Sequence, residues 1–413
     1  MFHPAVNILL TFGLIIILLR NKVQTGWVML SAGIFLGLLY KVDLVGQLST
    51  LKRAIINPVF LQLGVALNII MFLEHVMRTR GYLNRTVAAL KNLIPSPKIN
   101  LMILPAFLGL LPSPGGAVFS APLVAEAGKG LSLSAEDHSL INYWFRHVWE
   151  FFIPMYPGVI LASQLLEVPV GKLSLMLSWF FYISIALGYF LYIRKIEVPM
   201  GVIEAASTTT NSPTAKGNAW IELWAGIWPV VAIVFTVLIF KTDVGLTVTA
   251  VLILLIIFNR YRIPDLKELW KESFNLSIVF LIAGILFFKE MLVTSGVITW
   301  MPVYLKSLGV PDLLVLVFLT FFVAFAIGLS QGYVAATFPL LIGIIGTGQN
   351  VNPGALVLAY ISGFIGIMLS PVHLCLFLTV DYFKADLIKV WRKVVFPGIV
   401  FLLSALLFAV IWK

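Results

Sequence analysis

The sequence has few charged residues for its length. Of its 413 residues, 60% are hydrophobic and only 11% are charged, against about 25% charged in an ordinary soluble domain. A soluble globule lacks an interior large enough for that much apolar surface, so the excess must face hydrocarbon. The composition excludes a soluble protein and predicts a multi-pass protein of the lipid bilayer.

Cysteine is almost absent as well. Cys375 is the only one in the chain, which excludes an internal disulfide framework and a zinc cluster built from cysteines. It lies in an apolar run, where we expect an inert core thiol.

Motifs for the common hydrolytic and nucleotide-driven chemistries are missing. The chain has no phosphate-binding P-loop, no His-Glu-x-x-His and no nucleophile elbow, so we expect neither an enzyme nor an ATP-driven pump. His147 and Glu150 have helical spacing, but without a second such pair we expect no bound metal. The net charge of +10 is assigned to membrane topology, with no nucleic-acid partner.

Ten apolar stretches are long enough to cross a hydrocarbon core of about 30 Å. A polar stretch rich in Ser and Thr separates the first five from the last five and is typical of a linker. We therefore divide the chain into a first half (1–195), a linker (196–218) and a second half (219–413). The stretches lie at about 6–19, 26–40, 57–77, 138–162, 172–193, 220–240, 244–258, 275–300, 354–380 and 394–412.

Two other uncharged stretches predict re-entrant hairpins. In the first, at about 99–127, prolines and glycines around Ser113-Pro-Gly-Gly leave arms too short to span the membrane. The second, at about 311–347, turns around Ser330-Gln-Gly and has longer arms, so its length alone also allows full crossings. A non-helical tip at membrane depth must be buried in protein or line a wet cavity.

The two halves resemble each other at a nearly constant offset. Ser113 and Ser330 are 217 residues apart, and Pro157 and Pro371 are 214 apart, which predicts an internal repeat. Lys and Arg concentrate in the loops of one side, which the positive-inside rule makes cytoplasmic. The linker is then inside and both termini outside. Because each half makes an odd number of crossings, the two repeats are expected to be inverted.

The predicted fold is thus an all-α polytopic membrane protein of the cytoplasmic (inner) membrane. It has about ten transmembrane helices, two re-entrant helical hairpins and an inverted five-plus-five repeat. The stretches at about 138–162 and 354–380 are expected to be helices broken by proline, because proline removes a backbone donor and clashes with the preceding turn.

The stretch Asn142–Gly158 carries most of the chemistry. It places Arg146, His147 and Glu150 inside a predicted span and then breaks the helix at Pro157. The freed carbonyls can bind a cation, while an arginine or a helix N-terminus can hold a carboxylate. The alternative is a packing kink with an Arg–Glu ion pair. Charges inside a membrane are expensive, which favours a functional site.

The second broken helix has lost these charges but keeps Ser370, Pro371 and His373. His373 is open to three interpretations: a proton carrier, a ligand donor or a satisfied interior histidine. Lys289 and Glu290 lie inside another predicted span. They are expected either to pair with the charges of the first broken helix or to form an interfacial ion pair of the scaffold.

The hairpin tips have the composition for close approach of backbone to a small solute. Glycine lets amides converge, and serine and glutamine add neutral donors and acceptors. The alternative is a turn whose glycines only allow tight packing. The tip residues that we expect to bind substrate are Ser113, Gly115, Gly116, Ser330, Gln331 and Gly332.

At Asn142–Gly158 and at the Ser113-Pro-Gly-Gly tip, the chain resembles the ion-transporter superfamily of divalent-anion/sodium symporters and citrate and gluconate permeases. Within it, the chain looks closest to the integral membrane family called domain of unknown function 401. The resemblance implies a homodimer, each protomer with a scaffold and a transport domain that shifts like an elevator. The anion symporters carry Ser-Asn-Thr at their tips, whereas Ser113-Pro-Gly and Ser330-Gln-Gly match only the serines.

The predicted function is secondary active transport of a small, carboxylate-type organic anion, coupled to Na⁺ or H⁺ and without a cofactor. Arg146 is the expected counter-charge for the anion. The candidates for coupling-ion or proton binding are His147, Glu150, Pro157, Ser370, Pro371 and His373. Alternatives are a cation/proton antiporter without an organic substrate, an intramembrane enzyme acting on lipid, and a passive channel.

Overall fold

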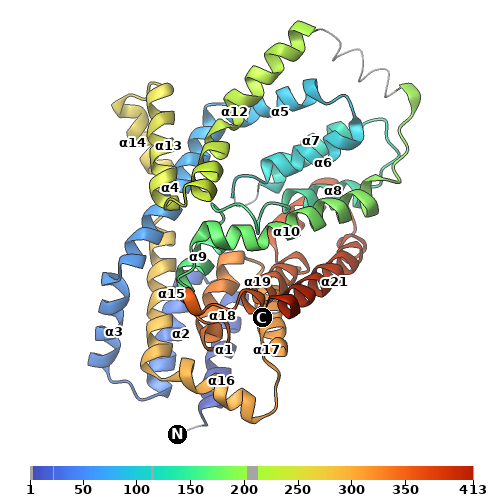
Figure 1. Cartoon of the computed structure of the whole chain (residues 1–413). Helices are drawn as coiled ribbons and strands as arrows, with labels where there is room; N and C mark the ends of the chain where they lie inside the picture. The colour runs from blue at the N-terminus through green and yellow to red at the C-terminus, as the bar shows by residue number, and fades with distance from the viewer. Residues whose placement is uncertain (1–2, 22, 113–115, 202–212, 413) are drawn as a thin grey trace.

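The computed structural model describes residues 3–21, 23–112, 116–201 and 213–412, and all regular structure in these ranges is helical. Figure 1 shows the arrangement. The elements are α1 (Pro4–Arg20), α2 (Thr25–Leu39), α3 (Leu44–Ile56), α4 (Pro58–Thr79), α5 (Tyr82–Leu93), α6 (Pro97–Leu108), α7 (Ala117–Ala127), α8 (Ala135–Arg146), α9 (Pro157–Leu165), α10 (Val170–Gly188), η1 (Tyr189–Ile193), α12 (Pro213–Ile239), α13 (Val244–Phe258), α14 (Ile263–Ser273), α15 (Leu276–Thr294), α16 (Val297–Ser307), α17 (Asp312–Ile327), α18 (Ser330–Ile345), η2 (Gly348–Asn350), α19 (Pro353–Met368), α20 (Leu374–Phe383) and α21 (Leu387–Ile411).

Five helices of the described chain are long and apolar enough to cross a membrane. They are α4, α10 continued by η1, α12, α15 and α21, and the bent pair α16–α17 makes a sixth if it counts as one span. The other predicted spans are helices too, but each is short or divided. The number of ten crossings therefore stays a prediction, while the long and short apolar helices support a membrane protein.

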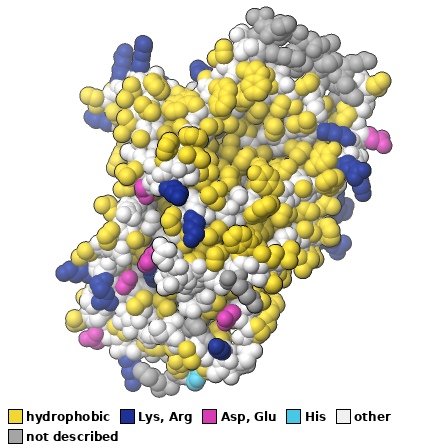
Figure 2. Space-filling view, viewed as in Figure 1, with side chains coloured by type: hydrophobic (Ala, Val, Ile, Leu, Met, Phe, Trp, Pro, Cys, Tyr) yellow, Lys and Arg dark blue, Asp and Glu magenta, His cyan; other side chains and the backbone are white. Residues whose placement is uncertain are grey.

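The surface has the character expected of a chain in contact with lipid. Large apolar side chains such as Trp179, Phe190 and Leu407 are more than half exposed. Figure 2 shows apolar side chains over most of one face, with most of the charged side chains toward its margins. Exposed apolar surface on this scale is unfavourable in water and favourable in hydrocarbon.

The helices pack in two groups. In one, α15 packs on α2 and α3, α13 on α4, and α12 on α5. In the other, α6 packs on α7 and α8, α17 on α18 and α19, and α19 on α21. The N-terminus and the end of α12 next to the linker lie at opposite ends of the molecule (Figure 1).

Three boundaries differ from the sequence prediction. The predicted span 275–300 ends at Thr294, because Gly296 adopts a left-handed conformation (φ 72°) and turns the chain into α16. The second hairpin turns at Gly328, also left-handed (φ 69°), so that Ser330 begins the next helix instead of forming the tip. In the first broken helix, Pro157 begins α9 and does not interrupt a helix.

Helix α8, the first arm of that broken helix, begins with a capping box. The Ser134 hydroxyl accepts from the Asp137 backbone N–H, and the Asp137 carboxylate accepts from Ser134 N–H at 3.2 Å and from Lys393 Nζ at 2.6 Å. Burial raises the pKa of Asp137, but the hydrogen bonds from Lys393 and Ser134 outweigh it and hold the pKa below its usual value. Asp137 precedes the predicted span and joins the start of α8 to α21.

Replacing Asp137 by alanine is expected to lower the free energy of unfolding by about 1 kcal/mol at neutral pH, mostly through the lost side-chain acceptor of the capping box, because solvent screens the ion pair. A depressed carboxyl pKa stabilises above its unfolded value, about 3.9, and the contribution is lost as pH falls through the folded pKa. Urea unfolding of detergent-solubilised protein at neutral and acidic pH measures this. Asp381→Ala, which removes an exposed pair with Lys384, should change little, and an equal loss in both variants would contradict the capping role.

Candidate functional site

The first hairpin, α6–α7, is held by side chains from the start of the first break. Arg146 Nη1 donates to the Leu108 carbonyl at 3.1 Å, and Trp149 Nε1 donates to the Ala106 carbonyl at 2.8 Å. Gly109 lies so close to Arg146 that a Cβ there would overlap the Arg146 carbonyl oxygen. These contacts seat the end of α6 on the break between α8 and α9.

The second hairpin, α17–α18, is held in the same way by the second break, between α19 and α20. Ser370 Oγ donates to the Phe325 carbonyl at 2.6 Å, and His373 Nδ1 is 2.7 Å from the Gly328 carbonyl oxygen. Gly328 reaches this position through its left-handed backbone, and a Cβ there would meet the His373 backbone nitrogen at 3.0 Å. Each hairpin therefore ends against a helix break.

The two broken helices also contact each other and the opposite hairpin. Asn142 Nδ2 of α8 donates to Thr379 Oγ1 of α20 at 3.0 Å, and Tyr143 Oη donates to the Met368 carbonyl at 3.0 Å. At the N-terminus of α9, a Cβ on Gly158 would lie 2.9 Å from Ser330 Cβ. Residues far apart in the sequence thus meet in one buried region.

The charged and polar side chains of this region are almost fully buried. Arg146, His147 and Glu150 are 5–7% exposed, and Ser330 and His373 are 8% and 6% exposed. Arg146 also lines a cavity of about 310 Å³ between the first hairpin and helices α4 and α5. The cavity includes Gly116, as well as Glu74 and Arg78, which form an ion pair at 3.4 Å.

Two histidines meet across the breaks. His147 follows α8 directly, and its Nε2 lies 3.0 Å from Nε2 of His373, the residue before α20. Glu150 Oε2 is 3.9 Å from the same His147 nitrogen. His147 and Glu150 lie in a chain of turns, not on a helix as their spacing indicated. Cys375 completes the group, because its Sγ and one nitrogen of each ring lie within 4.8 Å of one another.

Sequence reasoning missed Cys375 as a member of this group. Its apolar neighbours pointed to an inert thiol, yet it lies two residues after His373, at the start of a helix that follows a proline break. The spacing His-x-Cys beside Pro371 was the available signal. Its partner His147 is 226 residues from His373, so the sequence did not show that they meet.

The family model described as protein of unknown function (DUF401) matches residues 5–411, nearly the whole chain. The chain belongs to the DUF401 family. No curated protein matches the sequence.

In this DUF401 member, two of the predicted site residues, Ser113 and Gly115, lie outside the described residues. Gly116 lies at the N-terminus of α7 and lines the Arg146 cavity. Gln331 and Gly332 form the first turn of α18, with Ser330 Oγ 3.4 Å from Gln331 Oε1.

Lys289 and Glu290 lie on α15, and the described partner of Glu290 is not in the first broken helix. Glu290 Oε2 is 3.9 Å from Arg53 Nε of α3, whose Nη2 donates to Thr294 at 3.0 Å. The contact lies between helices of the first packing group, which fits the interfacial interpretation of this charged pair.

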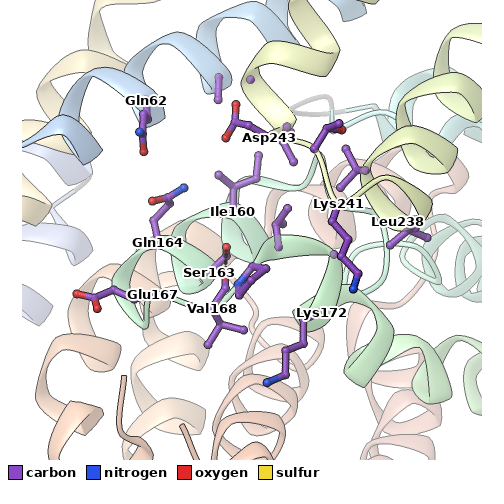
Figure 3. Close-up of a pocket in the computed structure, with 18 of the residues that line it drawn as sticks. Gln62, Ile160, Ser163, Gln164, Glu167, Val168, Lys172, Leu238, Lys241 and Asp243 are labelled. Atoms are coloured by element: carbon purple, nitrogen blue, oxygen red, sulfur yellow. Dashed lines mark hydrogen bonds between the residues drawn. The ribbon is translucent and has the colours of Figure 1, made fainter. Parts of the chain in front are cut away.

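A larger cavity, of about 770 Å³, lies beside α9 between α4, α10 and the α12–α13 connection. Figure 3 shows Gln62 and Gln164 extending toward one another, with Lys172 and Lys241 on the side away from Gln62. The cavity also includes the acidic residues Glu167 and Asp243, whose charge is opposite to that of the two lysines. It is therefore a mainly apolar cavity with a few polar and charged side chains, next to the second arm of the first broken helix.

Proposed function

We propose that this DUF401 protein is a secondary active transporter. It moves a small organic anion of the carboxylate type across the cytoplasmic membrane, coupled to Na⁺ or H⁺, by an elevator-like alternating-access mechanism. The observation that carries the proposal is the packing of both hairpins against both helix breaks around buried Arg146. Non-helical backbone at membrane depth is tolerated where it is buried in protein or lines a cavity, and charged residues there often mark a substrate path.

Arg146 suits the recognition of a carboxylate. Its guanidinium is always charged and presents a planar fork that matches two carboxylate oxygens. The cavity beside it, about 310 Å³, is at the small end of ligand pockets. A solute of a few carbon atoms therefore suits it better than a lipid.

Matching contacts in the two halves support the inverted repeat. Tyr156 and Ser370 each precede the proline of a break, and each donates to a carbonyl near the end of a hairpin's first arm. Gly81 and Gly296, which precede α5 and α16, share a left-handed conformation with φ of 75° and 72°. An inverted repeat predicts such matching contacts at equivalent positions.

The two cavities support alternating access. The Arg146 cavity includes Arg78, which follows the third predicted crossing and so lies on the side predicted to be cytoplasmic. The cavity of Figure 3 includes Lys172 and Lys241, which lie at the ends of the fifth and sixth predicted crossings that are predicted to face outside. A transport domain of hairpins and broken helices would move the anion between these sides.

We extend the proposal to membership of the ion-transporter superfamily and to a homodimer, in which the first packing group forms the scaffold. Such a scaffold would hold the protomers still while the second group moves. Cross-linking in native membranes, compared with mass measured in detergent, tests the oligomeric state.

Uptake into proteoliposomes tests the transport function. Radiolabelled mono-, di- and tricarboxylates are offered under an inward Na⁺ gradient, an inward H⁺ gradient or neither, with protein-free liposomes as control. We expect at least one carboxylate to accumulate against its gradient and the accumulation to collapse with the driving gradient. A correctly folded protein that accumulates none of them would contradict the proposal.

The buried group around His147, His373 and Glu150 favours a second candidate, a cation/proton antiporter without organic substrate. In that case a Na⁺ gradient alone would drive proton movement, read by an internal pH dye, and added carboxylate would not change it. Dependence of ion movement on the carboxylate separates the two functions.

A further inference from the structure

The hydrogen bonds of His147 and His373 fix where their lone pairs point. Nδ1 of His147 is 2.6 Å from the Tyr143 carbonyl oxygen, and Nδ1 of His373 is 2.7 Å from the Gly328 carbonyl oxygen. A carbonyl oxygen only accepts, so each Nδ1 must carry the hydrogen. In neutral rings, both Nε2 atoms are then bare acceptors.

These two bare nitrogens face each other at 3.0 Å. Two lone pairs at that distance repel unless a cation lies between or beside them. The burial of both rings strengthens the repulsion, because little solvent screens it. A positive charge bound between or beside the rings removes this repulsion.

The surroundings are those of a metal site. A ligating histidine almost always donates its other ring N–H to a carbonyl or carboxylate, which fixes the tautomer and the ring orientation. Both rings do so here with backbone carbonyls. The Cys375 Sγ within 4.8 Å of a nitrogen of each ring adds a soft ligand, and the Glu150 carboxylate, 3.9 Å from His147 Nε2, adds an oxygen.

The charges of this group balance for a divalent ion. A thiolate and a carboxylate together carry two negative charges, and neutral imidazoles carry none, so a divalent cation leaves the site neutral. Neutrality matters in this buried region, because an unbalanced charge there is expensive. Nitrogen and sulfur ligands favour Zn²⁺ over Mg²⁺ or Ca²⁺, which prefer oxygen.

The distances require only small adjustments: the two nitrogens move slightly apart, and the sulfur and the carboxylate approach. Ligand atoms around a tetrahedral Zn²⁺ are about 3.3–3.6 Å apart, given bond lengths of about 2.0 Å to nitrogen and 2.3 Å to sulfur. The two imidazole nitrogens already lie close to that separation, at 3.0 Å. The sulfur would move by about 1 Å, which a side-chain rotation supplies.

We propose that His147, His373 and Cys375 bind a zinc-class transition-metal ion, with Glu150 as the fourth ligand. The ion would join the first helix break to the start of α20 and so link the two halves of the chain. The site goes beyond the proposed function, because binding requires neither an anion nor a gradient. A protein that binds the ion but transports no carboxylate would contradict only the transport proposal.

The test uses full-length protein without a histidine tag, purified in detergent and treated with chelator. We expect one Zn²⁺ per chain after removal of excess ion, measured by elemental analysis. Co²⁺ should give intense visible bands of tetrahedral geometry and a sulfur-to-metal charge-transfer band in the near ultraviolet. Because Cys375 is the only cysteine, the reaction of the protein with a small maleimide reports this site alone, and Zn²⁺ should slow it at least tenfold.

Single substitutions assign the ligands. Cys375→Ser should abolish the charge-transfer band, and His147→Asn or His373→Asn should weaken Zn²⁺ binding by on the order of 100-fold or more. His3→Asn is the matched control, because His3 is exposed and outside the group, and it should keep one ion. If a variant fails to fold, the spectrum and thiol protection of the unsubstituted protein still decide the question.

The proposal is overturned if the folded, unsubstituted protein binds no ion, or if bound Co²⁺ shows no thiolate band. It is also overturned if Zn²⁺ leaves the maleimide reaction unchanged, the outcome expected when the two imidazoles share a proton instead of a metal.

Discussion

Replacing Arg146 by alanine is expected to lower the initial rate of carboxylate uptake about 100-fold at subsaturating substrate, because the substrate's negative charge loses its buried partner. The loss should appear mainly as a higher KM. Arg146→Lys should restore part of the uptake, since an ammonium keeps the charge but lacks the planar fork. Rates are measured in proteoliposomes that contain equal amounts of each protein.

Two controls separate binding from folding. Arg53→Ala removes an arginine whose ion pair with Glu290 is half exposed, and its uptake should stay within about twofold of the unsubstituted rate, as such pairs contribute little. The melting temperature of each variant in detergent shows whether Arg146→Ala is folded. Folded Arg146→Ala with unchanged KM and rate would remove Arg146 from the substrate site.

Gly109→Ala is expected to destabilise the protein by about 1–3 kcal/mol or more, through overpacking, and to abolish uptake. The backbone of Gly109 is ordinary (φ −72°), so the obstacle is space alone. The added methyl group overlaps the carbonyl oxygen of Arg146, and backbone cannot move aside as a flexible side chain can. The hairpin must then leave the break. Thermal unfolding in detergent, followed by tryptophan fluorescence, measures the loss.

Gly13→Ala is the matched control for that substitution. Gly13 lies in α1, and nothing lies within 4 Å of the position a Cβ would occupy. Alanine there should be neutral or slightly stabilising, because glycine is the poorer helix former. Equal melting temperatures for the two variants would mean that the hairpin does not pack on Arg146 in the membrane protein.

The helical regions were predictable because a membrane accepts mainly one kind of segment, a long apolar run without charges. Long uncharged apolar runs form helices wherever lipid or protein surrounds them, so each predicted stretch contains a helix. In the stretches 99–127 and 354–380, proline and glycine indicated where a helix would stop, because their effects on backbone are local. Local chemistry is what a single sequence reports best.

The site was only partly predictable, because its contacts join distant parts of the chain. The sequence singled out Arg146, His147 and His373, but it did not show that the two histidines lie 3.0 Å apart. It placed the second tip at Ser330, because Gly328 and Gly332 both suit a turn. The structure places the turn at Gly328. It also left two interpretations of Glu290 open. The partner of Glu290, Arg53, lies on helix α3, which the sequence did not predict.

The hydrogen bonds that hold the hairpins against the helix breaks have a consequence for how this protein tolerates mutation. In these seating contacts, the hairpin contributes backbone carbonyls, while the breaks contribute side chains such as Arg146, Trp149 and Ser370. Carbonyls persist whatever side chain a residue carries, so the acceptor positions Ala106, Leu108 and Phe325 can vary with little loss of hydrogen bonding, whereas each donor is lost with its residue. For these hydrogen bonds, a saturation-mutagenesis map should therefore be lopsided, tolerant of residues of similar size at the acceptor positions and intolerant at the donor positions.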